Sequence, residues 1–178
     1  NGWLGQKSGQ GFYKKIKKGV IHSLDLNTLE YTPQHKSRFK GIGLAKEKIS
    51  LDKRLKALLW SPDVAGEFSW EIFSRTFLYS AFRIGEIAED IVSIDNALKW
   101  GFAWSSGPFQ TWESLGFTNV LDRMKADGKS IPKWIDEMSV NGLTSFYKIV
   151  NNEECYYSPI EKNYLPIPRS EKELTFSM

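Results

Sequence analysis

The fold of this protein is organised around the stretch Gly107-Pro108-Phe109-Gln110-Thr111-Trp112-Glu113-Ser114-Leu115-Gly116. Proline suits the first turn of a helix, where its missing N–H is not needed, and glycine commonly ends one. The stretch therefore predicts a short helix that begins at Pro108 and is closed by Gly116.

On both sides of this stretch, apolar residues recur at helical spacing between turn signals. Further helices are predicted at Leu51–Trp60, Val64–Asp90, Ile94–Trp100, Asn119–Ala126 and Lys133–Val140. Ser50, Ser93 and Thr118 are the candidate N-caps, and Pro132 begins the last helix. The pattern indicates a mainly α, multi-helical module with β-hairpin attachments.

A similar ending occurs twice in the chain. The glycine-rich segment Gly2–Tyr13 ends in Phe-Tyr and is followed by Lys14, and the segment Asn141–Lys148 ends in the same Phe-Tyr-Lys. A hairpin is predicted after each ending, at Lys14–Tyr31 in the first case, and Tyr31-Thr32-Pro33 is matched by Tyr164-Leu165-Pro166. We therefore predict an internal duplication, in which residues 1–13 end a first helical module, 14–48 form a hairpin and linker, 49–148 form a second module, and 149–178 form a hairpin and exit linker.

The composition is that of a globular domain, with 41% hydrophobic and 25% charged residues in 178. The single cysteine, Cys155, excludes an internal disulfide and a cysteine-based zinc site, which fits a reducing cytoplasm. No apolar run approaches the length of a membrane span. The net charge of +3 includes a lysine cluster at Lys14–Lys18 and further basic residues at 36–48. The cluster could meet a phosphate-rich ligand such as coenzyme A or nucleic acid, but a solvated edge strand is the favoured interpretation.

Catalytic patterns are sparse. No Gly-x-Gly-x-x-Gly follows a predicted strand and opens a helix, and no Walker-type phosphate loop is present. His22 and His35, the two histidines, lie in no triad or metal spacing. Glu86 and Asp90 could share one helix face as a metal or acid–base pair, although a solvated helix end is the favoured interpretation.

An aromatic set could line an acyl pocket, form an interface or simply pack the core. Its members are Trp100, Phe102, Trp104, Phe109 and Trp112.

Two motifs resemble a known family. Asp95-Asn96-Ala97-Leu98-Lys99-Trp100-Gly101, followed by Gly107–Gly116, is similar to the C-terminal domain of 3-hydroxyacyl-CoA dehydrogenases. The opening Leu4–Tyr13 looks like the usual ending of that same domain. Together the resemblance covers Gly2–Tyr13 and roughly Val64–Lys148.

The resemblance implies a function in fatty-acid β-oxidation. In this family the helical domain binds substrate and associates subunits, while a preceding Rossmann domain supplies NAD and a catalytic His–Glu pair. Long bacterial forms carry two helical copies, the second standing in for a partner subunit. The expectation is therefore a fragment without its own turnover, cofactor or metal. Its expected partners are acyl-CoA, the Rossmann domain and the first helical module, with no nucleic acid and no membrane.

The departures from the family pattern indicate a structural role for the second copy. Family copies that act on substrate usually carry Asn-Arg in the long helix, where this sequence has Ser74-Arg75, and Gln110 replaces a common carboxylate. The expected substrate or inter-module contacts are Lys7, Ser74, Arg75, Trp104, Gly107, Pro108, Phe109 and Glu113. The alternative is a non-enzymatic helical module whose aromatic face around Trp100–Trp112 docks a partner chain.

Overall fold

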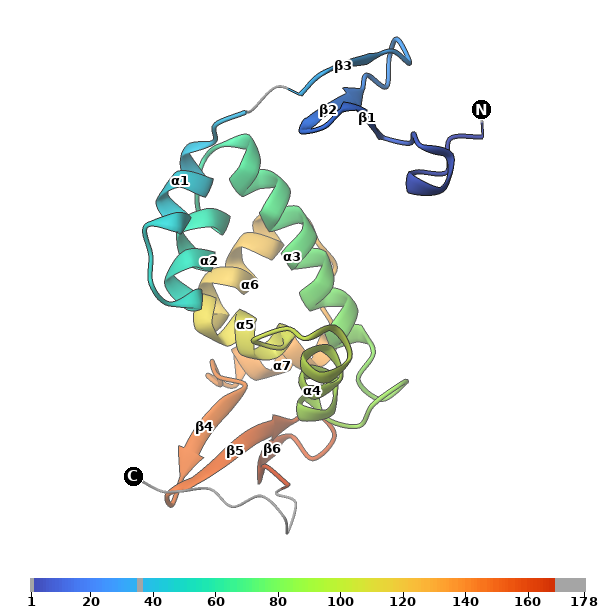
Figure 1. Ribbon diagram of the computed structural model, residues 1–178. Coiled ribbons are helices and arrows are strands. Elements are labelled where there is room, and N and C mark those ends of the chain that lie inside the picture. The colour runs from blue at the N-terminus through green and yellow to red at the C-terminus, as the bar shows by residue number, and fades with distance from the viewer. Residues whose placement is uncertain (1, 35–36, 169–178) are drawn as a thin grey trace. The chain divides into compact units, whose positions relative to one another are not determined.

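A computed structural model describes residues 2–34 and 37–168 of the chain (Figure 1). The chain divides between Arg38 and Phe39 into two compact units. His35 and Lys36 lie outside the described residues, so the expectations for them are not addressed by the structure.

The first unit is a small antiparallel sheet preceded by a glycine-rich turn. A single turn of 3₁₀-helix, η1 (Gln6–Ser8), leads into β1 (Tyr13–Lys17), β2 (Val20–Leu24) and β3 (Tyr31–Pro33), which pair in the order β1-β2-β3. The hairpin predicted over Lys14–Tyr31 is therefore one strand too short. The three residues of β3 form that extra strand, because Tyr31 pairs with Leu24 and Pro33 with His22.

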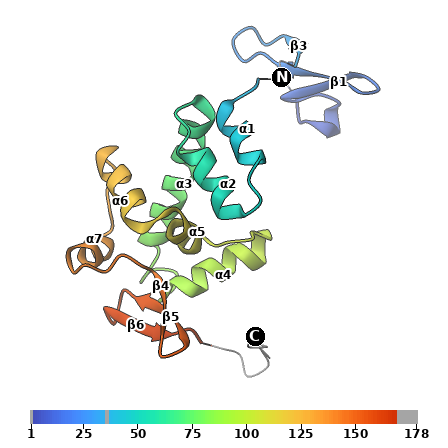
Figure 2. The ribbon, with the colours of Figure 1, turned by 90° about the vertical axis from the view of Figure 1, so that its left-hand side faces the viewer.

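The second unit consists of helices followed by a second small sheet. Its elements are α1 (Lys40–Lys46), α2 (Leu51–Leu59), α3 (Val64–Phe82), α4 (Ile91–Phe102), α5 (Pro108–Leu115), α6 (Phe117–Ala126), α7 (Lys133–Val140), β4 (Tyr147–Val150), β5 (Glu153–Ser158) and β6 (Asn163–Pro166). The prediction of a mainly α fold with β attachments is confirmed. Within this unit the sheet lies at one end of the helices (Figure 2).

The helices α5 and α7 begin and end as predicted, at Pro108–Leu115 with Gly116 after it and at Lys133–Val140. Ser50 precedes α2 at the N-cap position, although its side chain makes no capping hydrogen bond. The helix α6 begins at Phe117, directly after Gly116, and not behind a Thr118 cap.

The prediction of a single long helix at Val64–Asp90 is wrong. The helix α3 ends at Phe82, and the left-handed conformation of Gly85 (φ +81°) belongs to a loop that leads to α4. Ile84 and Ala88 continue the helical spacing of apolar residues beyond Phe82, so the sequence pattern did not indicate that the helix ends there. Asp90 caps α4 by accepting a hydrogen bond from the Ser93 amide, so α4 begins at Ile91 and not behind Ser93.

The pairing of Glu86 with Asp90 on one helix face is wrong for the same reason. Both residues lie in the loop between α3 and α4, where Glu86 forms an ion pair with Arg83 (2.9 Å). The carboxylate of Asp90 is committed to the α4 cap. Neither residue lies within a helix, so the two do not share a helix face.

The helix α1 was not predicted, and its residues were assigned to the linker within residues 14–48. Gly41 is needed there, since a Cβ on it would lie 2.7 Å from the Cβ of Ser61. The Gly41 amide also donates to Asp63 Oδ2 (2.8 Å), and the same carboxylate caps α3 through Gly66. This contact holds α1 against the α2–α3 turn.

The core is aromatic and lies where α3, α5, α6 and α7 meet the second sheet. Phe77 stacks on Trp112, which stacks in turn on Phe117. Phe146 enters this stack edge-on from the segment before β4. Because aromatic side chains bury 150–250 Å² each, these contacts dominate the apolar burial of so small a core.

Candidate functional site

The motif that contains Asp95 and Gly107 forms the joint between α4 and α5. The carboxylate of Asp95 is buried and accepts hydrogen bonds from the amides of Phe109 (2.8 Å) and Gln110 (3.0 Å). These amides belong to the first turn of α5, where N–H groups have no partner inside the helix and the helix dipole favours a negative charge. Asp95 thus caps a helix that begins thirteen residues after it.

Gly107 is required by the closeness of this joint. A Cβ on Gly107 would lie 2.4 Å from the Cα and Cβ of Asp95, which no real side chain tolerates. The spacing of Asp95 and Gly107-Pro108-Phe109 is therefore explained by backbone packing.

The hydroxyl of Tyr147 completes the environment of Asp95 by donating to Oδ2 at 2.7 Å. Burial raises the pKa of Asp95 to about 6, although the three hydrogen bonds it accepts favour its charged form. Burial, followed by the charge of Asp95, raises the pKa of Tyr147 above its ordinary range. Tyr147 therefore stays protonated and acts as a hydrogen-bond donor.

A second carboxylate holds the segment before β4 to α5. Glu113 accepts from the Phe146 amide (2.6 Å) and from the Ser145 hydroxyl (2.7 Å). Hydrogen bonds to an ionised acceptor are stronger than neutral ones, so this pair fixes the entry of the chain into the sheet.

Between these two polar anchors, Phe146 is completely buried. Its ring centroid lies 5.1–5.2 Å from those of Phe109, Trp112 and Phe117, in edge-to-face geometry, and 6.1 Å from that of Trp134. We call these four rings the Phe146 socket. Asp95, Glu113 and the socket together attach the second sheet to the helices.

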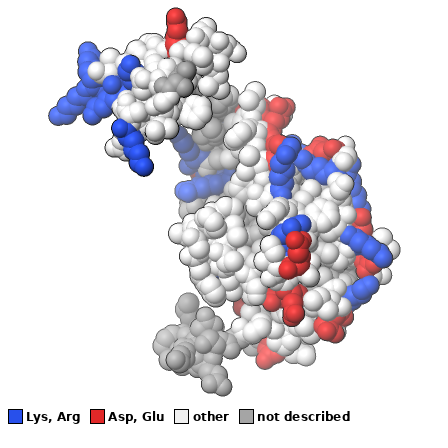
Figure 3. Space-filling model, turned by 90° about the vertical axis from the view of Figure 1, so that its right-hand side faces the viewer, with Lys and Arg blue, Asp and Glu red and all other residues white. Residues whose placement is uncertain are grey.

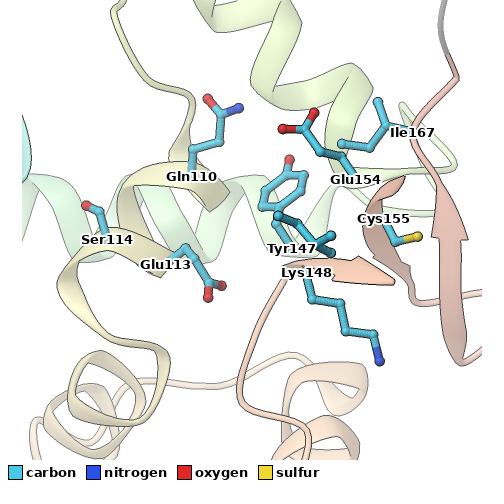
Figure 4. A pocket seen from close by; sticks show the side chains of 9 residues that line it. Gln110, Glu113, Ser114, Tyr147, Lys148, Glu154, Cys155 and Ile167 are labelled. Atoms are coloured by element: carbon cyan, nitrogen blue, oxygen red, sulfur yellow. The ribbon is translucent and has the colours of Figure 1, made fainter. Parts of the chain in front are cut away.

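A groove of about 410 Å³ adjoins this attachment between α5 and the strands β4 and β5 (Figure 4). It is lined by Gln110, Glu113, Ser114, Tyr147, Lys148, Ile149, Glu154, Cys155 and Ile167. Its potential nucleophile, Cys155, is buried, and no histidine is among the described residues that line the groove. Within residues 2–34 and 37–168, no group of three or more His, Cys, Asp or Glu side chains is placed to hold a metal ion.

The structure brings together four of the eight expected site residues. Gly107, Pro108, Phe109 and Glu113 all lie on or beside α5, where Pro108 and Phe109 are buried and Glu113 binds the Phe146 segment.

The other four are separate. Ser74 is 0% exposed in the middle of α3, and its hydroxyl donates to the Glu71 carbonyl of the same helix (3.3 Å). Arg75 is exposed and pairs with Glu71, Trp104 follows α4 in the sequence, and Lys7 is exposed in η1 of the first unit.

Sequence analysis missed the roles of Asp95, Ser145, Phe146 and Tyr147 as a set. Asp95 belongs to the motif that resembles the family, and the other three belong to the repeated ending at Asn141–Lys148. Their separation of about fifty residues gave no signal that Tyr147 would reach Asp95.

The aromatic set around α4 divides into two groups. Phe109 and Trp112 are core residues, whereas Trp100 and Phe102 are largely exposed and Trp104 is 41% exposed. Exposed apolar residues also follow one face of α3, at Val64, Phe68, Ile72 and Tyr79. The side of the molecule seen in Figure 3 includes a broad area of this unit without charged side chains. In the part of the chain that the structure describes, no helix combines the length and apolarity needed to cross a membrane.

Comparison with known proteins supports the family resemblance, although no family model matches the chain. A probable 3-hydroxyacyl-CoA dehydrogenase of Bacillus subtilis is 43% identical over 156 residues, which is 88% of this chain and 20% of that protein. Putative fatty acid oxidation complex trifunctional enzymes of Rickettsia felis and Rickettsia prowazekii are 31% and 29% identical over 114 residues, or 60% of this chain.

The chain spans only a fifth of the length of the Bacillus relative and 14% of the length of each Rickettsia relative. The similarity therefore concerns one segment of these longer proteins. The resemblance seen in the motifs is confirmed, and the chain is homologous to part of the 3-hydroxyacyl-CoA dehydrogenases.

Proposed function

We propose that the chain forms the C-terminal helical region of an NAD-dependent 3-hydroxyacyl-CoA dehydrogenase of fatty-acid β-oxidation. The whole protein would oxidise 3-hydroxyacyl-CoA to 3-ketoacyl-CoA in the cytoplasm. Its NAD and catalytic His–Glu pair would lie upstream, in a Rossmann domain. The names of the relatives support this assignment, since all three refer to 3-hydroxyacyl-CoA dehydrogenase or to fatty acid oxidation.

Within such an enzyme, this region serves as a structural pseudo-subunit. The observation that carries this proposal is the complete burial of Ser74, whose hydroxyl bonds the backbone of its own helix. A substrate-binding asparagine needs an accessible carboxamide with both a donor and an acceptor, which this position does not offer. The Gly-Pro-Phe motif is likewise occupied in packing, around Asp95 and Glu113.

The exposed face of α3 and α4 supports the association part of this role. Large apolar side chains occupy four exposed positions on α3, from Val64 to Tyr79, and two more on α4, at Trp100 and Phe102. Exposed apolar areas of this kind commonly mark protein interfaces. The first helical module of the same enzyme is the proposed partner.

The first experiment restores the family residue with Ser74→Asn in the full-length dehydrogenase. Turnover should be unchanged, whereas the melting temperature should fall, because overpacking a core position costs about 1–3 kcal/mol. Ser74→Ala is the matched control, since it removes only the hydroxyl. A clear gain in turnover with Ser74→Asn would contradict the pseudo-subunit role.

The second experiment is calorimetric titration of the folded chain with acetoacetyl-CoA. We expect no saturable binding and no NADH formation by the chain alone. Saturable binding would overturn the structural role and direct attention to the groove beside Lys148 and Cys155.

A non-enzymatic interaction module is the second candidate, favoured by the exposure of Trp100 and Phe102. The coding sequence upstream of the segment that encodes this chain distinguishes the two candidate functions. A dehydrogenase requires a Gly-x-Gly-x-x-Gly motif after a predicted strand, and an interaction module does not.

A further inference from the structure

The ends of the hairpins β1–β2 and β4–β5 carry opposite charges. The repeated Phe-Tyr-Lys sequence, which begins at Phe12 and at Phe146, leads into both hairpins, and their registers are equivalent apart from a β-bulge in β1. The end of the first hairpin carries three lysines, Lys15, Lys17 and Lys18. The end of the second hairpin carries Glu153 and Glu154 instead. The basic charge therefore belongs to the first hairpin and not to the local fold that the two hairpins share.

Protection of a sheet edge accounts for only one lysine in each sheet. The strands β1 and β4 are both edge strands, and each has one lysine after its tyrosine. The ammonium of Lys14 lies over the Tyr31 ring, 5.2 Å from its centroid. That of Lys148 lies over the Tyr164 ring at 3.5 Å. Since β4 has no further lysine, edge protection does not explain the three lysines at the end of the first hairpin.

These three lysines are exposed and have no carboxylate beside them. Among the residues that the structure describes, every ion pair lies in the second unit. The two acidic residues of the first unit, Asp25 and Glu30, lie between β2 and β3, and Asp25 accepts from two amides of the turn there. Residues 2–34 have a formal net charge of +3, equal to that of the whole chain. Basic side chains accordingly gather on the first unit, the upper body in Figure 3.

Two aliphatic side chains lie among these lysines. Ile16 is 50% exposed and Ile21 is 48% exposed. The β-bulge leaves Ile16 without a partner in the register of β1 and β2. We call residues 15–21 the basic hairpin end. It combines three ammonium groups with two exposed isoleucines, and it contains no aromatic residue and no carboxylate.

The second hairpin shows which part of such a sheet remains open when helices cover the rest. The first two residues of β5, Glu153 and Glu154, are exposed, whereas the four that follow are buried against the helices. Ile149, on the opposite strand, is 72% exposed. We therefore expect the equivalent basic hairpin end to stay accessible whatever covers the remainder of the first sheet.

We propose that the basic hairpin end binds the surface of a membrane that contains anionic phospholipids. The lysines contact the phosphates of the head groups, because the negative potential of such a surface attracts clustered basic side chains. Ile16 and Ile21 enter the boundary between the head groups and the acyl chains, where apolar side chains add to the electrostatic attraction. A contact of this kind is made at the membrane surface and requires no spanning helix.

Two other anionic partners fit the basic hairpin end less well. A nucleic acid is commonly bound by aromatic side chains that stack on its bases, and residues 15–21 include none. A nucleotide-sized ligand needs a pocket in which its phosphates meet several cations. The groove of about 680 Å³ that reaches Lys15 includes neither Lys17 nor Lys18. Membrane binding does not depend on the dehydrogenase activity proposed above, so either can be absent without the other.

Sedimentation with lipid vesicles tests the proposal. The 178-residue chain is mixed with vesicles of phosphatidylcholine and phosphatidylglycerol, and separately with vesicles of phosphatidylcholine alone. The chain should sediment with the anionic vesicles and stay in solution with the neutral ones. A rise in salt concentration should release it, because salt screens the attraction between lysines and phosphates.

Replacement of two lysines measures the contribution of charge. Lys17→Gln combined with Lys18→Gln should weaken partitioning into the anionic vesicles about 30-fold, or about fivefold for each lysine. Lys53→Gln combined with Lys56→Gln is the matched control, because both of these lysines are exposed on α2, outside the first unit. The control should bind as the wild type does.

Replacement of one isoleucine measures the apolar contribution. Ile16→Ser should weaken the same partitioning about tenfold and leave its dependence on salt unchanged. Leu29→Ser is the matched control, because Leu29 is also 50% exposed but lies between β2 and β3, away from the basic hairpin end. Circular dichroism of each variant checks that it is folded.

Four results would overturn the proposal. The first is equal sedimentation with anionic and neutral vesicles, and the second is a double lysine variant that binds as the wild type does. The third is tighter binding of a single-stranded oligonucleotide than of anionic vesicles, which would identify nucleic acid as the partner. The fourth is an absence of binding by the longest polypeptide that the gene encodes around this chain, which would show that the basic hairpin end is covered there.

Discussion

The sheets β1–β3 and β4–β6 have the same strand order and, apart from a β-bulge between Lys15 and Lys17, equivalent registers, but opposite environments. In the second sheet, Cys155, Tyr156, Tyr157 and Ser158 are buried against the helices, whereas no residue of β1, β2 or β3 is buried. The comparison teaches that the local sequence is sufficient to specify the strands and their hydrogen bonds. The burial of the second sheet depends on the helices beside it, which carry the Phe146 socket, Asp95 and Glu113.

The largest difference between the sheets should appear on removal of the equivalent phenylalanines. Phe146→Ala should lower the free energy of unfolding by about 3–5 kcal/mol, because it leaves a cavity among four aromatic rings. Phe12→Ala in the same chain should change it by less than about 0.5 kcal/mol, as surface substitutions do. Urea denaturation measures both. Equal losses for the two variants would mean that Phe12 is already buried in this chain.

The contact between Tyr147 and Asp95, which Tyr13 lacks here, should make stability depend on pH. Because the folded state raises the pKa of Asp95 from 3.8 to about 6, it binds a proton that the unfolded chain releases between these values. The stability contributed by Asp95 is therefore fully present below about pH 4 and is lost as the pH rises through 6, a change of about 3 kcal/mol at most.

Denaturation of the wild type and of Asp95→Asn at intervals from pH 4 to 7.5 measures this change as the difference between the two proteins. The difference removes the opposite trend from carboxylates whose pKa is lowered, such as Glu71 and Glu137. Parallel curves would show that Asp95 does not titrate differently in the folded state.

Gly107→Ala tests the close packing of Gly107 against Asp95, the residue that accepts a hydrogen bond from Tyr147. The added Cβ would meet Asp95 at 2.4 Å, so we expect a loss of about 1–3 kcal/mol of stability from overpacking. Gly101→Ala is the matched control, because its Cβ meets nothing within 4 Å, and alanine in a helix gains up to about 1 kcal/mol over glycine. Thermal unfolding should therefore shift in opposite directions for the two variants, and a shift in the same direction would contradict the role of Gly107.

The smallest expected effect concerns the lysine over each tyrosine. Lys148→Met should cost about 0.5–1 kcal/mol, the usual range for an exposed cation–π contact. Lys14→Met should cost less, because the ammonium of Lys14 lies farther from its ring, at 5.2 Å compared with 3.5 Å. A larger loss for Lys14→Met, measured by urea denaturation, would break the equivalence of the two contacts.

Sequence patterns determined the local structure of this protein well where short-range signals were strong. Pro108 and Gly116 set the limits of α5, and the repeated Phe-Tyr-Lys ending correctly marked two related β segments. Where the signals conflicted, the pattern failed. Apolar spacing extended the predicted helix α3 through Gly85, and the residues of α1 were assigned to a linker, because sequence periodicity does not show the tertiary contacts that decide such positions.

Only the tertiary structure determined which residues act together. Asp95, Glu113, Phe146 and Tyr147 are up to 52 positions apart, and their hydrogen bonds form only after α4, α5 and β4 have packed. Phe12 and Phe146 are preceded and followed by similar residues, yet one is exposed and the other buried. The physical reason is that the pairing of strands is specified locally, by the alternation of side chains and by the turns. The burial of a side chain on the sheet depends instead on the other part of the protein that packs against that sheet.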